Sequence, residues 1–210
     1  MLKAMVVGCG RIAGNHDQAL TTHGGAYQAE KTVKIIACLD FDLERRIAFA
    51  DSYQCDAEQE LQTALKKHKP DIVSVCTPDN THFNITEDIL FSVFKPKVIF
   101  LEKPACSSRI ELNKLINKSN QVNVPIVVNH SRRFDQHHQQ LRDRISTGEF
   151  GDLRSAYAAY YSGWQHNGIH IIDTLSYLFH ESIIVDMVTS AWESPYDGDP
   201  TMELLASFKK

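Results

Sequence analysis

The sequence predicts an α/β protein: a doubly wound parallel sheet followed by an α+β domain with an open, antiparallel or mixed sheet. Over the first 130 residues, short β-branched apolar runs alternate with longer helix-like stretches, which is typical of βαβ units. A glycine-rich turn follows the first run, and polar clusters follow three later ones. After Asn129 the rhythm changes to fewer helices and longer strands, so we expect domains at 1–129 and 130–210.

Apolar composition and helix-breaking residues delimit the elements of the first domain. Pro70 ends one helix and Pro78 ends the strand after it. A later helix carries Ile85, Ile89 and Leu90 on its apolar side. The remaining expected elements are strands at 4–7, 33–39, 71–76, 97–101 and 125–128, and helices at 43–53, 61–68 and 108–118. In the helix at 43–53, we expect Ile47, Ala48 and Ala50 to form the buried side.

The second domain is expected to combine two helices with two or three strands. The helices are predicted at 134–146 and 169–179, and the strands at 153–161, 183–192 and 202–208. The chain stops inside the last apolar strand pattern, so a C-terminally truncated product and an incomplete sheet are expected.

Composition and charge exclude several classes of protein. The net charge of −4 offers no basic surplus for a nucleic-acid partner, and the cluster 66–69 is read as solvated surface. No apolar run reaches the ~20 residues that cross a bilayer. Five scattered cysteines without C-x-x-C spacing favour reduced thiols and a cytoplasmic location over disulfides or a zinc site.

The segment Gly8-Cys9-Gly10-Arg11-Ile12-Ala13 has the pattern G-x-G-x-x-A directly after a strand. In a Rossmann domain the first glycine permits a tight turn, the second lets the backbone approach a pyrophosphate, and the loop opens a helix. Asp40 ends the second strand, where a carboxylate accepts from the adenosine ribose and repels a 2′-phosphate. This favours NAD over NADP. The long spacing implies an extended loop near 23–26. The alternative is a glycine turn with a surface aspartate and no ligand.

Three further strand ends carry polar sequences: Cys76 to His82, Glu102-Lys103-Pro104, and Asn129 to Arg133. With the glycine motif, the strand-end aspartate and a later G-x-H-x-I-D, they stand in the order typical of one family. The chain resembles the glucose-fructose oxidoreductase, inositol dehydrogenase and rhizopine catabolism family (Gfo/Idh/MocA). The resemblance covers essentially the whole sequence. It implies a nicotinamide-dependent enzyme acting on sugars, polyols or their derivatives.

The resemblance also assigns site residues. The pyrophosphate would lie against Gly8, Gly10, Arg11 and Ile12, and the adenosine ribose against Asp40. The residues that would border the rest of the cofactor are Thr77, Pro78, Asn80, His82, Glu102 and Lys103. An unusual peptide geometry is implied at the Lys103–Pro104 bond. Lys103 would polarise the substrate oxygen, because an ammonium there stabilises developing negative charge. Its alternative reading is a surface lysine.

His170 matches the family's catalytic histidine, and a near-neutral imidazole suits proton transfer. Asp173 follows on the same helical face, where it can orient a neighbouring ring or cap local backbone. Many members have an aspartate where this chain has His166, so His166 is a substrate contact or an alternative proton carrier. No metal is expected at His166 and His170, because Gly168 lies between them and no H-E-x-x-H glutamate is present.

Together these expectations describe an NAD-dependent dehydrogenase or reductase that transfers a hydride between nicotinamide and a sugar-like hydroxyl or ketone. Arg132 and Arg133 suit an anionic substrate. The family also implies a homo-oligomer formed through the second-domain sheet. The alternative function is a catalytically silent NAD(H)-binding paralogue or subunit, and a substrate-binding module without cofactor would leave the glycine loop idle.

Overall fold

The computed structural model describes residues 1–15 and 19–209. The chain divides into two compact units, Met1–Asn129 and His130–Lys210. None of the helices among these residues is long and apolar enough to cross a membrane.

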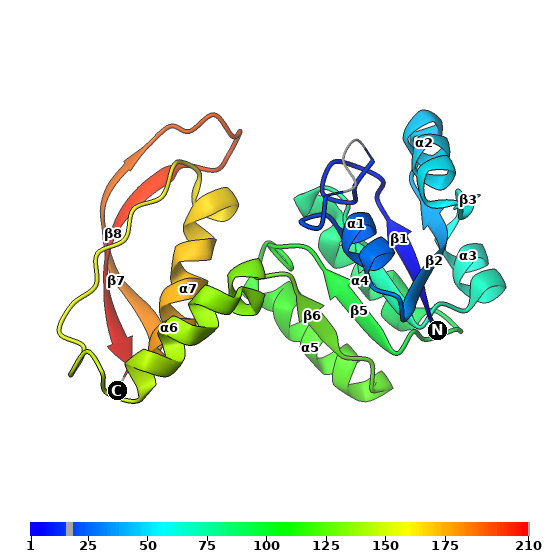
Figure 1. The fold of residues 1–210 in the computed structure, drawn as a ribbon. Helices are drawn as coiled ribbons and strands as arrows, with labels where there is room; N and C mark the ends of the chain where they lie inside the picture. Colours follow the sequence, from blue (N-terminus) through cyan, green and yellow to red (C-terminus); the bar gives the residue numbers. More distant parts are fainter. Residues whose placement is uncertain (16–18, 210) are drawn as a thin grey trace. The chain divides into compact units, whose positions relative to one another are not determined.

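The first unit contains a six-stranded, fully parallel sheet (Figure 1). Its strands are β1 (Leu2–Val7), β2 (Val33–Leu39), β3 (Asp56–Glu58), β4 (Ile72–Val75), β5 (Val98–Leu101) and β6 (Ile126–Val128). Their order is β3-β2-β1-β4-β5-β6, with every neighbouring pair parallel, which confirms the doubly wound fold. The short polar strand β3 was not expected. The strand order reverses direction between β1 and β4, and in such sheets ligands bind beyond the carboxyl ends of the strands at that point.

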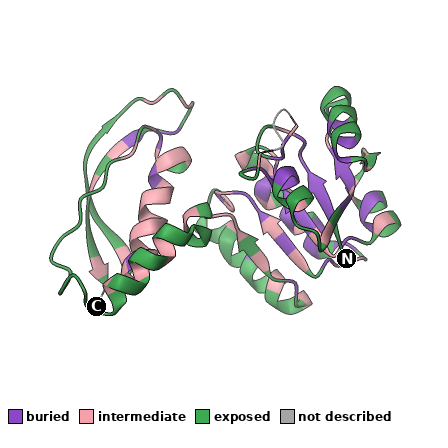
Figure 2. Cartoon of the chain, viewed as in Figure 1, coloured by how far each residue is buried: buried purple, intermediate pink, exposed green. Residues whose placement is uncertain are grey.

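Helices cover both faces of this sheet. The five are α1 (His23–Ala29), α2 (Leu43–Tyr53), α3 (Leu61–His68), α4 (His82–Phe91) and α5 (Arg109–Val122). Side chains alternate along β1, so Met5 and Val7 join the apolar cluster beneath α3, α4 and α5, while Val6 joins the cluster beneath α2. Figure 2 shows that the buried residues concentrate in the central strands of the sheet.

The glycine motif does not open a helix, which corrects one expectation. Residues 11–14 form turns, and α1 begins only at His23. The glycines at 24 and 25 lie inside α1, so the expected extended loop near 23–26 is also wrong. The physical reason is packing and capping: a Cβ on Gly24 would lie 2.4 Å from the Tyr53 ring, and the Thr22 side chain accepts from the Gly25 amide.

Helix α2 has the expected bounds, and Ala50 is buried as expected, but Ile47 and Ala48 are exposed. Phe49, Ala50, Tyr53 and Arg46 are buried, whereas Ile47 is 46% exposed. The two aromatic rings, four residues apart, pack at 4.4 Å between centroids. Their large apolar area therefore determines which side of α2 faces the sheet.

The second unit consists of α6 (Gln136–Ser146), α7 (Ile169–Phe179) and an antiparallel pair, β7 (Ser182–Trp192) and β8 (Thr201–Lys209). One 3₁₀ turn, Ser131–Phe134, precedes α6, and a π-helical turn, Trp164–Gly168, leads into α7. The predicted open antiparallel sheet is confirmed as this small two-stranded sheet.

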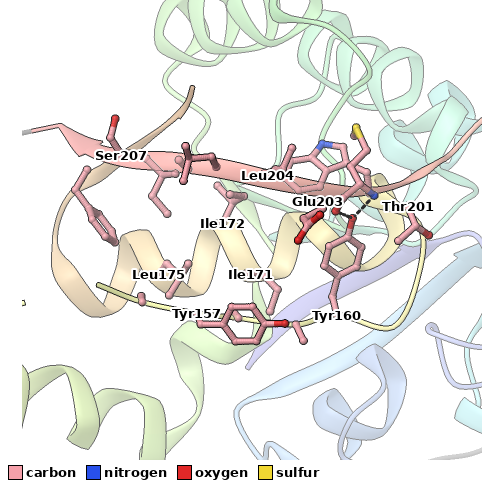
Figure 3. Close-up of a pocket in the computed structure, with 18 of the residues that line it drawn as sticks. Tyr157, Tyr160, Ile171, Ile172, Leu175, Thr201, Glu203, Leu204 and Ser207 are labelled. Carbon is pink, nitrogen blue, oxygen red and sulfur yellow. Dashed lines mark hydrogen bonds between the residues drawn. The ribbon is translucent and has the colours of Figure 1, made fainter. Parts of the chain in front are cut away.

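Residues 153–161 form no strand, contrary to expectation. A cavity of about 480 Å³ is lined by Ala156–Tyr160 and by residues of β8, with Ile171, Ile172 and Leu175 of α7 also lining it (Figure 3). The Tyr160 hydroxyl bonds both the N–H and the carbonyl of Met202, at 2.7 Å each. A side chain thus takes the place of backbone pairing at this edge of β8.

Candidate functional site

The glycine loop after β1 touches the loop after β4. Gly8 has a φ of +90°, and a Cβ on it would lie 2.7 Å from the backbone carbon of Cys76 and 2.7 Å from the nitrogen of Thr77. Only glycine therefore fits this position. The contact brings the ends of two neighbouring strands together at the switch point.

Gly10 differs, because a Cβ added to it would meet no atom within 4 Å. Among described residues, no group accepts a hydrogen bond from the amides of Gly10, Arg11 or Ile12. The buried Oδ1 of Asn15 likewise has no partner in the described part of the chain. Open space beside unpaired amides fits a pyrophosphate. The first amides of α1 are different, since those of His23 and Gly24 donate to the carbonyls of Ile12 and Ala13.

Asp40, at the end of β2, binds the glycine loop directly. Its Oδ2 accepts from the Cys9 amide at 2.7 Å, and its Oδ1 accepts from the Asp42 amide at 2.9 Å. The Arg46 guanidinium donates to the Asp40 carbonyl at 2.6 Å. Each carboxylate oxygen keeps a further lone pair for a ribose hydroxyl.

The loop after β4 is tied to the loop after β5 by His82. Its imidazole is fully buried between the carbonyl oxygens of Pro104, 2.6 Å from Nδ1, and Thr77, 2.8 Å from Nε2. The Thr81 hydroxyl also reaches the Thr77 hydroxyl at 2.7 Å. His82 therefore joins the loop after β4 to the loop after β5. In the loop after β4, Pro78 and Asn80 are exposed.

Glu102 and Lys103 follow β5, and the Lys103–Pro104 peptide is cis. The Glu102 side chain turns inward and is 10% exposed, with its Oε1 2.6 Å from the Asn129 amide nitrogen. Lys103 is half-buried. Burial opposes ionisation of Glu102, yet the pKa of this carboxyl lies below its ordinary value because His23 and Asn129 donate to it.

His23 is the residue that sequence reasoning missed. Its Nε2 lies 2.9 Å from Glu102 Oε1 and its Nδ1 lies 3.1 Å from the Ser74 hydroxyl. The sequence did contain one indication of a buried polar contact. Ser74 places a hydroxyl group in an apolar strand, and a buried hydroxyl needs a hydrogen-bond partner. The sequence could not name the partner, because it comes from a helix 51 residues earlier.

All five cysteines are free thiols, as expected. Cys76 lies at the strand-end site, where burial raises the pKa of its thiol. It is therefore protonated at neutral pH, and it contributes packing beside Gly8.

In the second unit, His166 lies in the π-helical turn before α7. Its ring stacks on Tyr196, with centroids 3.9 Å apart and planes at 6°. The buried Asp199 accepts from the amides of Gln165 and His166, at 2.7 and 3.0 Å, and its Oδ2 is 3.6 Å from the His166 ring. A carboxylate distant in sequence therefore lies beside the histidine.

Replacement of Asp199 by asparagine should lower the free energy of unfolding by about 1 kcal/mol, because one of two part-buried amides loses its acceptor. Urea denaturation of the whole chain measures this. The matched change at the exposed Asp197 should leave the midpoint unchanged. Equal stability of the two variants would show that the Asp199 contacts do not hold the turn.

His170 lies at the start of α7, with its ring edge-on to His130 at 6.4 Å between centroids. Asp173 binds Arg133 through two nitrogens, with 2.7 Å from Nη2 and 2.9 Å from Nε to Oδ1. Its Oδ2 also lies 3.7 Å from the His130 ring. Asp173 therefore neutralises Arg133, which weakens the reading of Arg133 as a group for an anionic substrate.

The basic cluster at 66–69 is not merely solvated. Lys67 pairs with Glu58 at 2.7 Å and Asp56 at 3.2 Å, and the His68 ring lies 2.7 Å from Glu58. Asp56, Glu58 and His68 are the one trio of metal-ligand types that the described residues bring together. Lys67 already supplies the positive charge there. His166 and His170 belong to no such trio among those residues.

The family model described as "Oxidoreductase family, NAD-binding Rossmann fold" (GFO_IDH_MocA) matches residues 2–130. Among curated proteins, the chain is similar to D-glucoside 3-dehydrogenase of Escherichia coli, at 24% identity over 72% of this chain and 41% of that protein. It is similar to inositol 2-dehydrogenase of Salmonella typhimurium, at 22% identity over 86% of this chain and 55% of that protein. The chain thus spans about half the length of these relatives.

Solved structures share the fold. The WlbA dehydrogenase from Chromobacterium violaceum, in complex with NADH and UDP-GlcNAcA, has a TM-score of 0.71 at 20% identity, covering 87% of this chain and 57% of that one. The scyllo-inositol dehydrogenase from Lactobacillus casei has a TM-score of 0.71 at 18% identity, covering 87% and 56%. With the family match over more than half of its length, the chain belongs to the Gfo/Idh/MocA oxidoreductase family, whose Rossmann fold binds NAD.

Proposed function

We propose that this chain is an NAD-dependent oxidoreductase that transfers a hydride between nicotinamide and a hydroxyl or ketone of a sugar, polyol or sugar derivative. One observation carries the proposal: Gly8 abuts Thr77, and His82 ties Thr77 to the loop that bears Lys103. These contacts gather the glycine loop and the lysine at one edge of the sheet. The relatives named above act on glucosides and inositols, which supports the substrate class.

Each part of this edge has a role in the proposal. The amides of Gly10, Arg11 and Ile12 bind the pyrophosphate, and Thr77, Pro78 and Asn80 border the cofactor, with the buried His82 holding Thr77 in place. The dinucleotide supplies the hydride acceptor or donor. Lys103 stabilises negative charge at the substrate oxygen as its proton leaves or arrives. In the second unit, His170 carries the proton, and His166 contacts substrate or serves as the second carrier.

Asp40 should set the preference for NAD, because a carboxylate repels a 2′-phosphate. Asp40→Ser should weaken NADH binding by about tenfold and strengthen NADPH binding by a similar factor, each corresponding to ~1.4 kcal/mol. Fluorescence titration of both cofactors measures this. Asp51→Asn, an exposed change in α2, is the control. An unchanged ratio of the two dissociation constants would remove Asp40 from cofactor selection.

The proposal as a whole is tested by titration with NADH and NADPH, followed by turnover on a panel of glucosides, inositols and other polyols with NAD⁺. NADH binding together with turnover supports the enzyme. NADH binding with no turnover on the panel favours the silent NAD(H)-binding paralogue. Binding of neither dinucleotide at millimolar concentration contradicts both. Assembly through the β7–β8 sheet stays a prediction, which the mass in solution would check.

A further inference from the structure

A network of hydrogen-bonded polar side chains crosses the face of the sheet beneath α1. The Tyr27 hydroxyl lies 2.7 Å from the Ser74 hydroxyl, which lies 3.1 Å from Nδ1 of His23. Nε2 of His23 then lies 2.9 Å from Oε1 of Glu102. Ser74, His23 and Glu102 are all buried. Polar groups this deep are retained only when their hydrogen bonds are made, so the four side chains form one unit.

The two end groups of this network, Tyr27 and Glu102, determine in which direction its hydrogen bonds are donated. Glu102 is ionised and only accepts, so Nε2 of His23 carries a hydrogen and donates. In the neutral tautomer, Nδ1 then accepts from Ser74, and Ser74 accepts from Tyr27. Burial raises the pKa of Tyr27 to about 12, so its hydroxyl keeps the proton that it donates. With His23 in that tautomer, every member donates toward the carboxylate, which is an arrangement that stabilises a buried anion.

The two oxygens of Glu102 are not equivalent. Oε1 accepts from both His23 and Asn129, at 2.9 and 2.6 Å. Among the described residues, Oε2 accepts only the long 3.3 Å bond from the Lys103 amide. Oε1 is therefore anchored in the interior, whereas Oε2 keeps a lone pair at the edge where Lys103 begins.

We propose that His23 is a positioning residue of the cofactor site: it holds the Glu102 carboxylate so that Oε2 can accept a hydrogen bond from the nicotinamide ribose. This rests on the function proposed above. The His23 ring contacts protein groups at both nitrogens and lies 5.0 Å from the Phe100 ring between centroids, so it acts through Glu102.

Two amide substitutions separate the two sides of the His23 ring. A glutamine amide nitrogen reaches the position of Nε2, and an asparagine amide nitrogen reaches that of Nδ1. His23→Gln should therefore keep the bond to Glu102, whereas His23→Asn keeps only the contact with Ser74. We expect the NADH dissociation constant to rise by less than about threefold in His23→Gln and by about tenfold or more in His23→Asn. His137→Asn, at an exposed histidine, controls for the substitution itself.

The decisive measurement is a double-mutant cycle with Glu102→Gln, read by NADH fluorescence titration and, without cofactor, by urea unfolding. If His23 acts through the carboxylate, His23→Asn has no further effect on NADH affinity once Glu102 is glutamine. Unfolding midpoints should fall further for His23→Asn than for His23→Gln. Equal loss of NADH affinity in both His23 variants, or an undiminished effect in the Glu102→Gln background, overturns the positioning role. A wild-type chain that fails to bind NADH overturns the proposed function with it, so the two failures are distinguishable.

Discussion

Lys103→Ala should lower turnover by about 10²–10⁴-fold while changing the NADH dissociation constant by less than about threefold. The range is the usual contribution of one group that handles a proton or charge in the transition state. Lys103 lies two residues after β5, between Glu102, whose carboxylate lies 2.9 Å from the His23 ring, and Pro104, whose carbonyl lies 2.6 Å from the His82 ring, so its neighbours hold the backbone that presents it. Turnover on the substrate found in the panel, and NADH fluorescence, measure the two quantities separately.

Lys97→Ala is the matched control for this change. Lys97 lies just before β5, is 73% exposed and pairs with Asp71 at 3.0 Å. Its loss should leave both turnover and NADH affinity unchanged. If Lys103→Ala retains wild-type turnover, then Lys103 is a surface lysine and another group must stabilise the oxygen.

Gly10→Ala and Gly8→Ala should separate binding from folding. Gly10 has open space where a Cβ would stand, so alanine should change the free energy of unfolding by less than about 0.5 kcal/mol. The same methyl group would occupy the approach of the pyrophosphate, so NADH affinity should fall by about tenfold or more. Urea unfolding and NADH titration of the one variant give both numbers.

Gly8→Ala should behave in the opposite way. Its Cβ would stand 2.7 Å from two backbone atoms of the β4 loop, at a φ of +90° that alanine adopts only with strain. We expect a loss of about 2–4 kcal/mol in unfolding free energy. Full NADH affinity in Gly10→Ala would place the pyrophosphate elsewhere, and a stable Gly8→Ala would contradict the close approach of the two loops.

The sequence by itself determined most of the first unit. The strands and helices of the parallel sheet follow from apolar runs whose ends are marked by proline, glycine or capping residues, and these signals are local. The strand ends that carry Gly8, Asp40, Thr77 and Lys103 were therefore visible, because a parallel sheet places them at one edge.

Only the tertiary structure decided which side chains partner one another. His23 meets Glu102 across 79 residues of sequence, and Asp199 meets His166 across 33. Neither pair produces a periodic pattern in the sequence, because each is a single contact between distant segments. The start of α1 was misplaced for the same reason: its Gly24 serves close packing against Tyr53, a contact from another helix.

The segment 153–161 shows the limit most clearly. Its pattern fits a strand, but a strand needs a backbone partner, and partners come from elsewhere in the chain. At that edge of β8 the Tyr160 hydroxyl occupies the Met202 backbone groups. Local sequence thus determined which segments can form strands and helices. Contacts between residues far apart in the sequence decided which extended segments joined a sheet and which charged side chains were paired.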